Sequence, residues 1–255
     1  MTTALVTGAT AGIGWTYARK LAEQGHDLVL VARDVERLKE RAEELRRLGV
    51  QAEVLGADLS DRDQVERVAE RLSDADRPVD LLVNNAGFGI RTPFTRTDVR
   101  DEERMLAVLC TAVLVLSHAA ANAMRDRGHG AIVNVSSVAG FAAMGSYSAA
   151  KAWVTTFSQA LSAELEGTGV RVQAMCPGFT RTEFHQRGGM RMTGVPDLAW
   201  LDVDDLVDAA LKDLRRGVVV SVPSARYKAV RHVLKHAPSG LVRRGSRGVG
   251  ARRRG

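Results

Sequence analysis

Short apolar runs alternate with longer amphipathic stretches along most of the chain. The runs at residues 4–6, 27–32, 51–57, 80–83, 131–135, 170–175 and 218–222 have the length of buried strands. The stretches at residues 12–24, 35–48, 62–72, 107–124 and 202–216, and one that opens at Tyr147, have the pattern of helices. Strands that alternate with helices predict an α/β fold with a parallel sheet.

The alternation continues without a change in composition to about residue 225. We therefore expect one domain over residues 1–225, followed by a tail over residues 226–255. The longest apolar run, at residues 107–124, lies in mid-domain and contains four polar residues: Thr111, Ser117, His118 and Asn122. These polar residues favour a buried or interface helix over a membrane span.

The composition is that of a soluble globular protein, with 45% hydrophobic and 26% charged residues. The first strand begins within a few residues of Met1, which leaves no room for a signal peptide. The two cysteines, Cys110 and Cys176, are far apart and in no paired motif, which favours a reducing compartment. We expect a cytoplasmic protein.

The formal charge of +6 is unevenly placed. The tail from Arg226 to Gly255 holds ten Lys and Arg residues and no acidic residue, which leaves 26 basic against 30 acidic side chains in the rest. Apolar residues recur in the tail at helical spacing: Val230, Val233, Leu234, Ala237 and Leu241. Such a basic amphipathic helix suits an anionic membrane surface or an acidic carrier, and equally a helix packed on the core with a solvated end.

Two other classes of partner are disfavoured in the tail. Its arginines have no aromatic platform beside them, so we expect no nucleic-acid binding. His232 and His236 lie four residues apart without an evident third ligand, so we expect no metal site.

A glycine-rich turn connects the first strand to the first helix. Residues 7–14 read Thr-Gly-Ala-Thr-Ala-Gly-Ile-Gly, with the glycines Gly8, Gly12 and Gly14. Glycines at this place permit a tight turn and close backbone approach, and the helix N-terminus offers free N–H groups to a pyrophosphate. The turn therefore predicts dinucleotide binding, although its spacing differs from the common Gly-x-Gly-x-x-Gly.

The residues at the end of the second strand indicate which nicotinamide cofactor, NAD(H) or NADP(H), the chain prefers. Dinucleotide folds that bind NAD usually place a carboxylate here, whereas an arginine suits the 2′-phosphate of NADP. This strand ends in Ala32 and Arg33, which favours NADP(H) over NAD(H), with a plain surface charge as the alternative. Asp34 follows and is predicted to cap the next helix.

Further polar residues follow the third and fourth strands. Asp58 and Leu59 come after the third strand, and the fourth runs into Asn84, Asn85, Ala86 and Gly87. Asp58 alone could be a helix cap and Asn85 a turn residue. Both lie at carboxyl ends of strands, where open parallel sheets bind their ligands.

The fifth strand ends in Ser136 and Ser137, and the next helix opens with Tyr147 and Lys151. Residues four apart lie on one helix face, so the phenol and the ammonium are side by side. A free phenol titrates near ~10, and lowering that pKa by about three units needs roughly 4 kcal/mol, which a close cation and a charged cofactor ring can supply. Tyr147 would then be a general acid/base, Lys151 its tuner and Ser137 the donor to a substrate oxygen. A Tyr-x-x-x-Lys pair alone is also an ordinary amphipathic helix start.

In this order and spacing, these residues resemble the short-chain dehydrogenase/reductase family of the single-domain Ser-Tyr-Lys type, from about Thr3 to Pro223. The matching positions are 7–14, Asp58, 84–87, Ser137, Tyr147 with Lys151, and Pro177-Gly178. The resemblance implies a Rossmann-type, doubly wound parallel sheet in three α/β/α layers and a nicotinamide cofactor. It also implies hydride transfer between the nicotinamide ring and a carbinol or carbonyl carbon.

The resemblance assigns a role to each part of the site. The glycine-rich turn, with Gly8, Thr10, Gly12, Ile13 and Gly14, would bind the cofactor, as would Arg33. Asp58 and Leu59 would contact the adenine, Asn85, Ala86 and Gly87 the adenosine ribose region, and Tyr147 and Lys151 the nicotinamide end, with Lys151 on its ribose. The segment with Pro177, Gly178, Thr180 and Thr182 would border the nicotinamide amide.

The chain departs from the family pattern in two places. Leu109 stands where members usually carry an asparagine that completes a proton relay, which puts the local helix distortion and the water chain in question. We expect slower proton exchange, not a dead enzyme. The interval of ten residues from Ser137 to Tyr147 is shorter than in many relatives. The usual alignment selects Ser137 over Ser136, which is expected to be structural.

These observations predict an NADP(H)-dependent reductase that converts a ketone to a secondary alcohol and forms a homodimer or homotetramer. A hydrophobic or acyl-chain substrate is favoured, since the resemblance implies a flap over residues 183–200 and six apolar residues could line a pocket: Phe141, Met144, Phe179, Met190, Met192 and Trp200. Such residues are as often plain packing. Two alternatives are an NAD-dependent alcohol dehydrogenase and a non-catalytic NADP(H)-binding sensor or scaffold.

Overall fold

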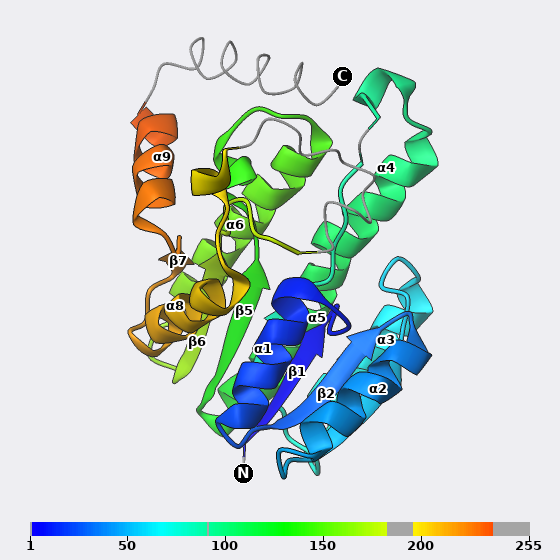
Figure 1. The fold of residues 1–255 in the computed structure, drawn as a ribbon. Coiled ribbons are helices and arrows are strands. Elements are labelled where there is room, and N and C mark those ends of the chain that lie inside the picture. Colours follow the sequence, from blue (N-terminus) through cyan, green and yellow to red (C-terminus); the bar gives the residue numbers. More distant parts are fainter. Residues whose placement is uncertain (1, 91, 183–195, 237–255) are drawn as a thin grey trace.

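The computed structural model describes residues 2–90, 92–182 and 196–236 (Figure 1). Within them, seven strands form one sheet in the order β3-β2-β1-β4-β5-β6-β7, with every neighbouring pair parallel. The strands are β1 Thr3–Thr7, β2 Asp27–Ala32, β3 Ala52–Gly56, β4 Leu81–Asn84, β5 Gly130–Val135, β6 Val170–Met175 and β7 Val220–Ser221. The predicted Rossmann-type fold is confirmed, and the strand order reverses between β1 and β4, where such sheets bind ligands.

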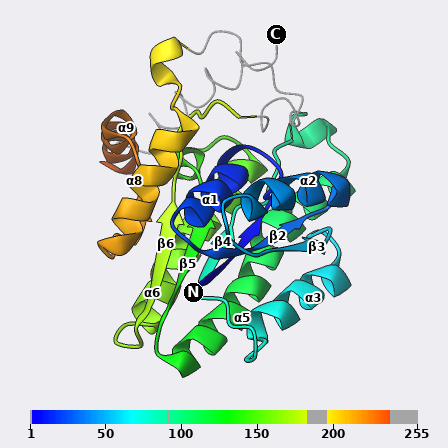
Figure 2. The ribbon, with the colours of Figure 1, turned by 60° about the horizontal axis from the view of Figure 1, so that its bottom comes forward.

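Helices cover both faces of the sheet (Figure 2). On one face lie α1 (Gly12–Glu23), α2 (Val35–Arg46) and α8 (Val203–Arg215), whose residues Ala18, Leu38 and Leu206 share one buried cluster. On the other lie α3 (Arg62–Ser73), α5 (Ala112–Arg127) and α6 (Ser146–Glu164), with Val65 and Leu116 in a second cluster. Because both faces are covered, the strands read as continuous apolar runs.

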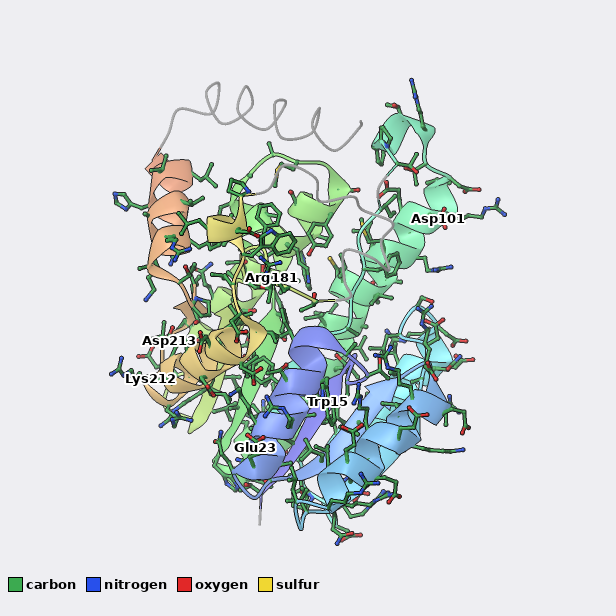
Figure 3. All side chains as sticks on the ribbon, in the orientation of Figure 1. Trp15, Glu23, Asp101, Arg181, Lys212 and Asp213 are labelled. Atoms are coloured by element: carbon green, nitrogen blue, oxygen red, sulfur yellow. The ribbon has the colours of Figure 1, made fainter. Side chains whose placement is uncertain are left out.

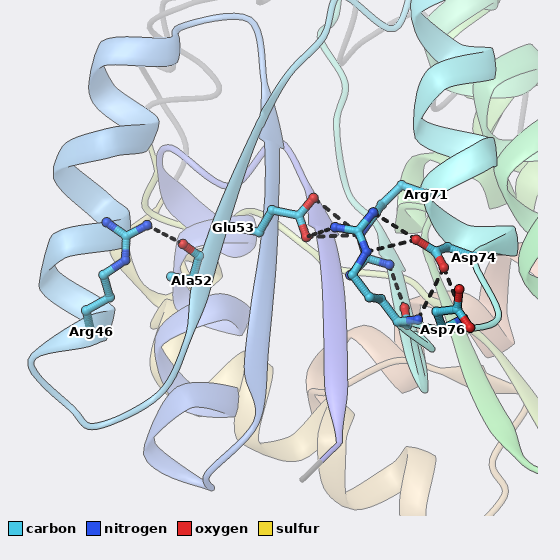
Figure 4. A network of polar contacts seen from close by, with 7 residues as sticks. Arg46, Ala52, Glu53, Arg71, Asp74 and Asp76 are labelled. Atoms are coloured by element: carbon cyan, nitrogen blue, oxygen red, sulfur yellow. Dashed lines mark hydrogen bonds and ion pairs between the residues drawn. The ribbon is translucent and has the colours of Figure 1, made fainter.

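The edge strand β3 is held by the helices on either side of it (Figure 4). Arg46 of α2 donates to the Ala52 carbonyl at 2.5 Å, and Arg71 of α3 pairs with the Glu53 carboxylate at 2.9 Å. Arg77 also approaches Glu53, at 3.6 Å. These contacts fix the strand that delivers Asp58 to the ligand edge of the sheet.

One continuous helix of 29 residues runs from Val99 to Arg127 and contains α4 (Val99–Leu106), a π-helical turn η2 (Ala107–Thr111) and α5. The sequence predicts its apolar part but not the charged first turns, which begin after the N-cap Asp98. This helix is long and apolar enough to cross a membrane by length and composition alone, but half of its most apolar stretch is buried inside the protein. That burial agrees with the prediction of a packed helix.

The remaining elements agree with the predicted boundaries to within a few residues, apart from the last strand. That strand is predicted over residues 218–222, but only Val220–Ser221 pairs with β6. Asp34 accepts a hydrogen bond from the Arg37 amide at 3.1 Å, so the predicted cap of α2 is confirmed. Helix α9 (Ala225–His236) then packs beside the short η3 turn (Val138–Phe141). The end of the predicted tail, residues 237–255, lies outside the described residues.

Candidate active site

The glycine-rich turn between β1 and α1, here called the glycine cradle, packs so closely against its neighbours that no side chain fits at its glycines. Gly8 and Gly12 have φ angles of 68° and 55°, in the left-handed region that favours glycine. A Cβ at Gly14 would lie 2.3 Å from Nδ2 of Asn85 and 2.4 Å from the Gly8 carbonyl oxygen. Since the turn opens the N-terminus of α1, it suits the pyrophosphate of a dinucleotide.

Thr7, the first residue of the turn, to which the sequence assigned no separate role, joins this turn to the end of β4. Its buried hydroxyl accepts hydrogen bonds from the backbone amides of Asn85 at 2.9 Å and Ala86 at 3.0 Å. Nδ2 of Asn85 donates in return to the Thr7 carbonyl at 2.9 Å. The resemblance predicts a ribose contact for Asn85, and the structure shows its side chain holding the glycine turn.

Arg41 of α2 supports the outer side of the same turn. Its guanidinium carbon lies 4.5 Å from the centroid of the Trp15 ring on α1, which Figure 3 labels. Its Nε donates to the carbonyl of Thr10, a buried member of the turn, at 3.4 Å. The next turn residue, Ile13, is half-buried and packs against the core.

Arg33 and Asp58 meet at the adenosine end of the predicted site. Nη1 of Arg33 lies 3.8 Å from Oδ2 of Asp58, and the Arg33 side chain is 64% exposed. Asp58 is partly desolvated, which opposes ionisation, but hydrogen bonds from Ser60 and the charges of Arg33 and Arg104 hold the pKa of its carboxyl below the ordinary value. Leu59 is buried in the core, so its side chain faces away from this surface.

The two serines after β5 have different surroundings. The Ser136 hydroxyl is buried and lies 2.7 Å both from the Lys151 carbonyl and from Oγ1 of Thr155. The Ser137 hydroxyl is half-buried and accepts a hydrogen bond from the Ala139 amide at 3.1 Å, as the cap of η3. Of the two serines, Ser137 is the less buried.

Tyr147 and Lys151 lie in the first turns of α6. The Lys151 ammonium is 5.8 Å from the centroid of the Tyr147 ring and donates to the Val135 carbonyl at 2.7 Å. Lys151 is 5% exposed, and burial lowers the pKa of its ammonium to about 8. The phenol is half-buried. A desolvated cation is thus placed beside the aromatic ring, which is the arrangement that favours the phenolate.

Leu109 lies inside the π-helical turn η2, so the helix distortion persists without an asparagine. Its side chain is buried with Met105 and Ala150 and packs against Tyr147. A Cβ at Gly87 would lie 2.7 Å from Cδ2 of Leu109, so the leucine fills the space beside that glycine. An asparagine side chain at position 109 is therefore not required for this backbone geometry.

Residues 177–182, here called the crossing segment, run from Ser137 to the glycine-rich turn. At its start, the Pro177 carbonyl accepts a hydrogen bond from the Val138 amide at 3.0 Å. At its end, Thr182 lies against Gly12, where an added Cβ would be 2.9 Å from Cβ of Thr182. Between them, the Thr180 hydroxyl donates to the Gly178 carbonyl at 3.1 Å. The crossing segment therefore joins the predicted catalytic and phosphate-binding parts of the site.

Of the six apolar residues predicted to line a pocket, the structure describes four: Phe141, Met144, Phe179 and Trp200. The rings of Phe179 and Trp200 lie 5.9 Å apart, and Arg181, labelled in Figure 3, lies over the Trp200 ring. Phe141 and Phe179 pack against the same buried cluster, and the guanidinium of Arg231 on α9 lies over the Phe141 ring. Met144 is half-buried near Tyr147 in the chain. Met190 and Met192, like most of the predicted flap, lie outside the described residues.

Comparisons with known proteins identify a family and similar structures for this chain. A family model described as short chain dehydrogenase matches residues 2–190. The structure is similar to a short-chain dehydrogenase from Sphingobium yanoikuyae in complex with NADPH, with a TM-score of 0.86, 41% identity and 94% of each chain covered. It is also similar to the bulky-bulky ketone specific alcohol dehydrogenase from Comamonas testosteroni, with a TM-score of 0.82 and 37% identity, covering 94% of this chain and 93% of that one.

A curated relative extends the range of similar proteins. Sulfoacetaldehyde reductase 2 from Chromohalobacter salexigens is 40% identical over 186 residues, which are 71% of this chain and 73% of that protein. That protein is named for sulfoacetaldehyde, whereas the Comamonas protein is named for bulky-bulky ketones. Similar proteins thus differ in substrate.

Proposed function

The chain belongs to the short-chain dehydrogenase family, and on that premise we propose that it reduces a ketone to a secondary alcohol with NADPH, with Tyr147 as the general acid. The observation that carries this proposal is the buried Lys151 ammonium beside the Tyr147 ring, held by the Val135 carbonyl at the carboxyl edge of the sheet. Such a constellation serves proton transfer, and the cradle serves a dinucleotide.

The residues present fit NADPH. The glycines of the turn let its backbone pack more closely against Asn85 and Thr182 than any Cβ would permit, and Arg33 stands at the adenosine end beside Asp58. Gly12 and Thr182 bring the crossing segment against the same turn. When bound, NADPH supplies the hydride that a carbonyl carbon accepts.

The chain's own residues handle the carbonyl oxygen. The Ser137 hydroxyl holds that oxygen by donating a hydrogen bond, and the Tyr147 hydroxyl delivers a proton to it as negative charge develops. Lys151 stabilises the phenolate left on Tyr147 through its charge. The carbonyl of Val135 accepts from the ammonium and fixes its position.

The substrate we propose is a hydrophobic ketone. The support is the pair of aromatic rings, Phe179 and Trp200, beside the crossing segment, and the similarity to an enzyme named for bulky ketones. Oxidation of NADPH measured against ketones of graded chain length, with small anionic aldehydes for comparison, tests this choice. Reduction of the anionic aldehydes alone would overturn the substrate class, and no reduction of any carbonyl compound would favour the sensor or scaffold.

Arg33→Ala tests the preference for NADP(H) over NAD(H). Loss of a charged donor to the 2′-phosphate should weaken NADPH binding about 10- to 100-fold and leave NADH binding nearly unchanged. Dissociation constants of both cofactors, measured by titration calorimetry, provide the check. Arg215→Ala, at the far end of α8, is the matched control. An unchanged preference in Arg33→Ala would favour the NAD-dependent alternative.

Leu109→Asn tests the departure from the family pattern. Because the π-helical turn exists with leucine, the amide should leave kcat unchanged or raise it several-fold, whereas burial of a polar group should lower stability by about 1–3 kcal/mol. Steady-state kinetics and thermal unfolding separate the two effects. Leu109→Ala controls for lost packing, and a sharp fall in kcat for Leu109→Asn alone would contradict the alignment.

We also propose that the chain is a cytoplasmic homodimer or homotetramer that associates through its long helices. Exposed apolar side chains lie along them, including Leu106, Leu114 and Trp153, with Trp153 stacked on Phe157. Apolar patches of this kind mark interaction surfaces. Cys110 and Cys176 are both free, in keeping with a reducing compartment.

A further inference from the structure

Tyr227 of α9 joins parts of the chain that lie far apart in sequence. Its hydroxyl accepts a hydrogen bond from the Phe179 amide at 3.1 Å and donates one to the Ala199 carbonyl at 2.8 Å. The first partner belongs to the crossing segment and the second to η4 (Asp197–Ala199). Figure 1 shows α9 beside the η4 turn. One phenol therefore ties three segments together.

The ring of Tyr227 also lies directly on Gly178. A Cβ at Gly178 would come within 2.1 Å of the ring, so only glycine permits this contact. The ring is 9% exposed and belongs to a buried cluster with Cys176 and Val222. Tyr227 thus holds two consecutive residues of the crossing segment, one through its ring and one through its hydroxyl.

Backbone contacts with Leu201 extend the restraint on Phe179 to the next residue of the crossing segment. The Leu201 amide donates to the Phe179 carbonyl at 2.8 Å, and Thr180 forms a parallel bridge with Leu201. The next residues lead to Thr182, which lies against Gly12 of the phosphate cradle. A shift at Phe179 would therefore move the residues that border both parts of the cofactor site.

We propose that Tyr227 is a positioning residue for the cofactor, through which the C-terminal helix α9 holds the crossing segment in the conformation that binds NADPH. The proposal rests on the proposed function only in requiring a nicotinamide cofactor. No contact between Tyr227 and the cofactor is needed. Its effect is to keep the binding-competent arrangement populated before the cofactor arrives, and affinity scales with that population.

Tyr227→Phe removes both hydrogen bonds and keeps the ring on Gly178. The dissociation constant for NADPH should rise about 5- to 30-fold, because the crossing segment samples other positions in the free protein. The kcat at saturating NADPH should change little. In hydrogen-exchange measurements, the Phe179 amide should exchange faster in the free variant and regain protection when NADPH is saturating, a response that a purely structural role would not produce.

Tyr17→Phe is the matched control, because the Tyr17 hydroxyl is buried in α1 and has no hydrogen-bond partner among the described residues. It should leave NADPH affinity unchanged. Gly178→Ala should displace the Tyr227 ring, because the added Cβ clashes with it. It should weaken NADPH binding more in the wild-type background than in Tyr227→Phe, where the hydrogen bonds of the Tyr227 hydroxyl are already lost. An unchanged dissociation constant in Tyr227→Phe, or a lowered melting temperature without a change in affinity, would overturn the proposal. Because binding is measured without a carbonyl substrate, a failure to reduce ketones would be a separate result.

Discussion

Tyr147→Phe should lower kcat for ketone reduction by about 10²- to 10⁴-fold, the usual contribution of a positioned general acid. The variant keeps the ring that packs with Met105, Leu109 and Ala150, so its stability should stay close to that of the wild type. NADPH affinity should also be nearly unchanged, since the cradle and Arg33 are untouched. Steady-state oxidation of NADPH, calorimetric titration and thermal unfolding measure the three quantities.

The same substitution at Tyr17 is the control. It shows whether kcat falls because the general acid is lost or because any tyrosine hydroxyl is removed. Tyr17→Phe should turn over ketones at the wild-type rate, because Tyr17 is fully buried in the core cluster between α1 and the sheet. Ketone-dependent consumption of NADPH that continues undiminished in Tyr147→Phe would remove the basis of the proposed mechanism. Loss of NADPH binding in that variant would instead mean that the phenol mainly holds the cofactor.

The sequence predicts the fold because its signals are local. Buried parallel strands must be apolar on both faces, so each appears as a short continuous run, and the glycines at positions 8, 12 and 14 mark a turn that other residues cannot form. Spacing alone also places Tyr147 and Lys151 on one helix face. The proximity of these two residues therefore follows from their separation of four positions in the chain.

The contacts that hold the site residues in place could not be predicted from the sequence, because each joins residues far apart in the chain. Thr7 holds Asn85 across 78 positions, and Tyr227 holds Phe179 across 48. In the centre of the sheet, Nδ2 of Asn84 donates to Oδ1 of Asn134 at 2.9 Å, which joins the ends of β4 and β5. None of these residue types is unusual at its own position, so only the tertiary arrangement reveals the role.

Leu109 shows a different limit of sequence reasoning. The family pattern links the helix distortion to an asparagine side chain, yet the π-helical turn forms around a leucine. Packing explains the difference, since Leu109 fills the space beside Gly87 and lies against Tyr147. A backbone irregularity can therefore be maintained by its neighbours after the side chain associated with it has changed.

Lys151→Met should lower kcat for ketone reduction by about 10²- to 10⁴-fold, because the phenol loses the cation that makes it acidic. The cofactor-free variant should nevertheless be more stable than the wild type at pH 7. Burial lowers the pKa of the Lys151 ammonium from 10.5 to about 8, a shift that corresponds to about 3 kcal/mol against the charged form. The variant also loses the hydrogen bond from the ammonium to the Val135 carbonyl, which costs about 1 kcal/mol. We therefore expect the free energy of unfolding to rise by about 1–2 kcal/mol in total.

The pH dependence of stability tests the cause of that gain. Since the folded-state pKa lies below that of the unfolded chain, the unfolded chain binds more protons between about pH 8 and pH 10.5, and the wild type should gain stability as the pH rises through this window. Below pH 8 the cost of the buried charge is fully present. Denaturant unfolding of the cofactor-free protein at several pH values should show this rise in the wild type and in Lys212→Met, an exposed-lysine control, but not in Lys151→Met. The result would contradict this account if Lys151→Met were less stable than the wild type at pH 7 and still gained stability between about pH 8 and pH 10.5. The Lys151 ammonium would then not be desolvated in the wild type, and the proposed cause of an acidic Tyr147 would be absent.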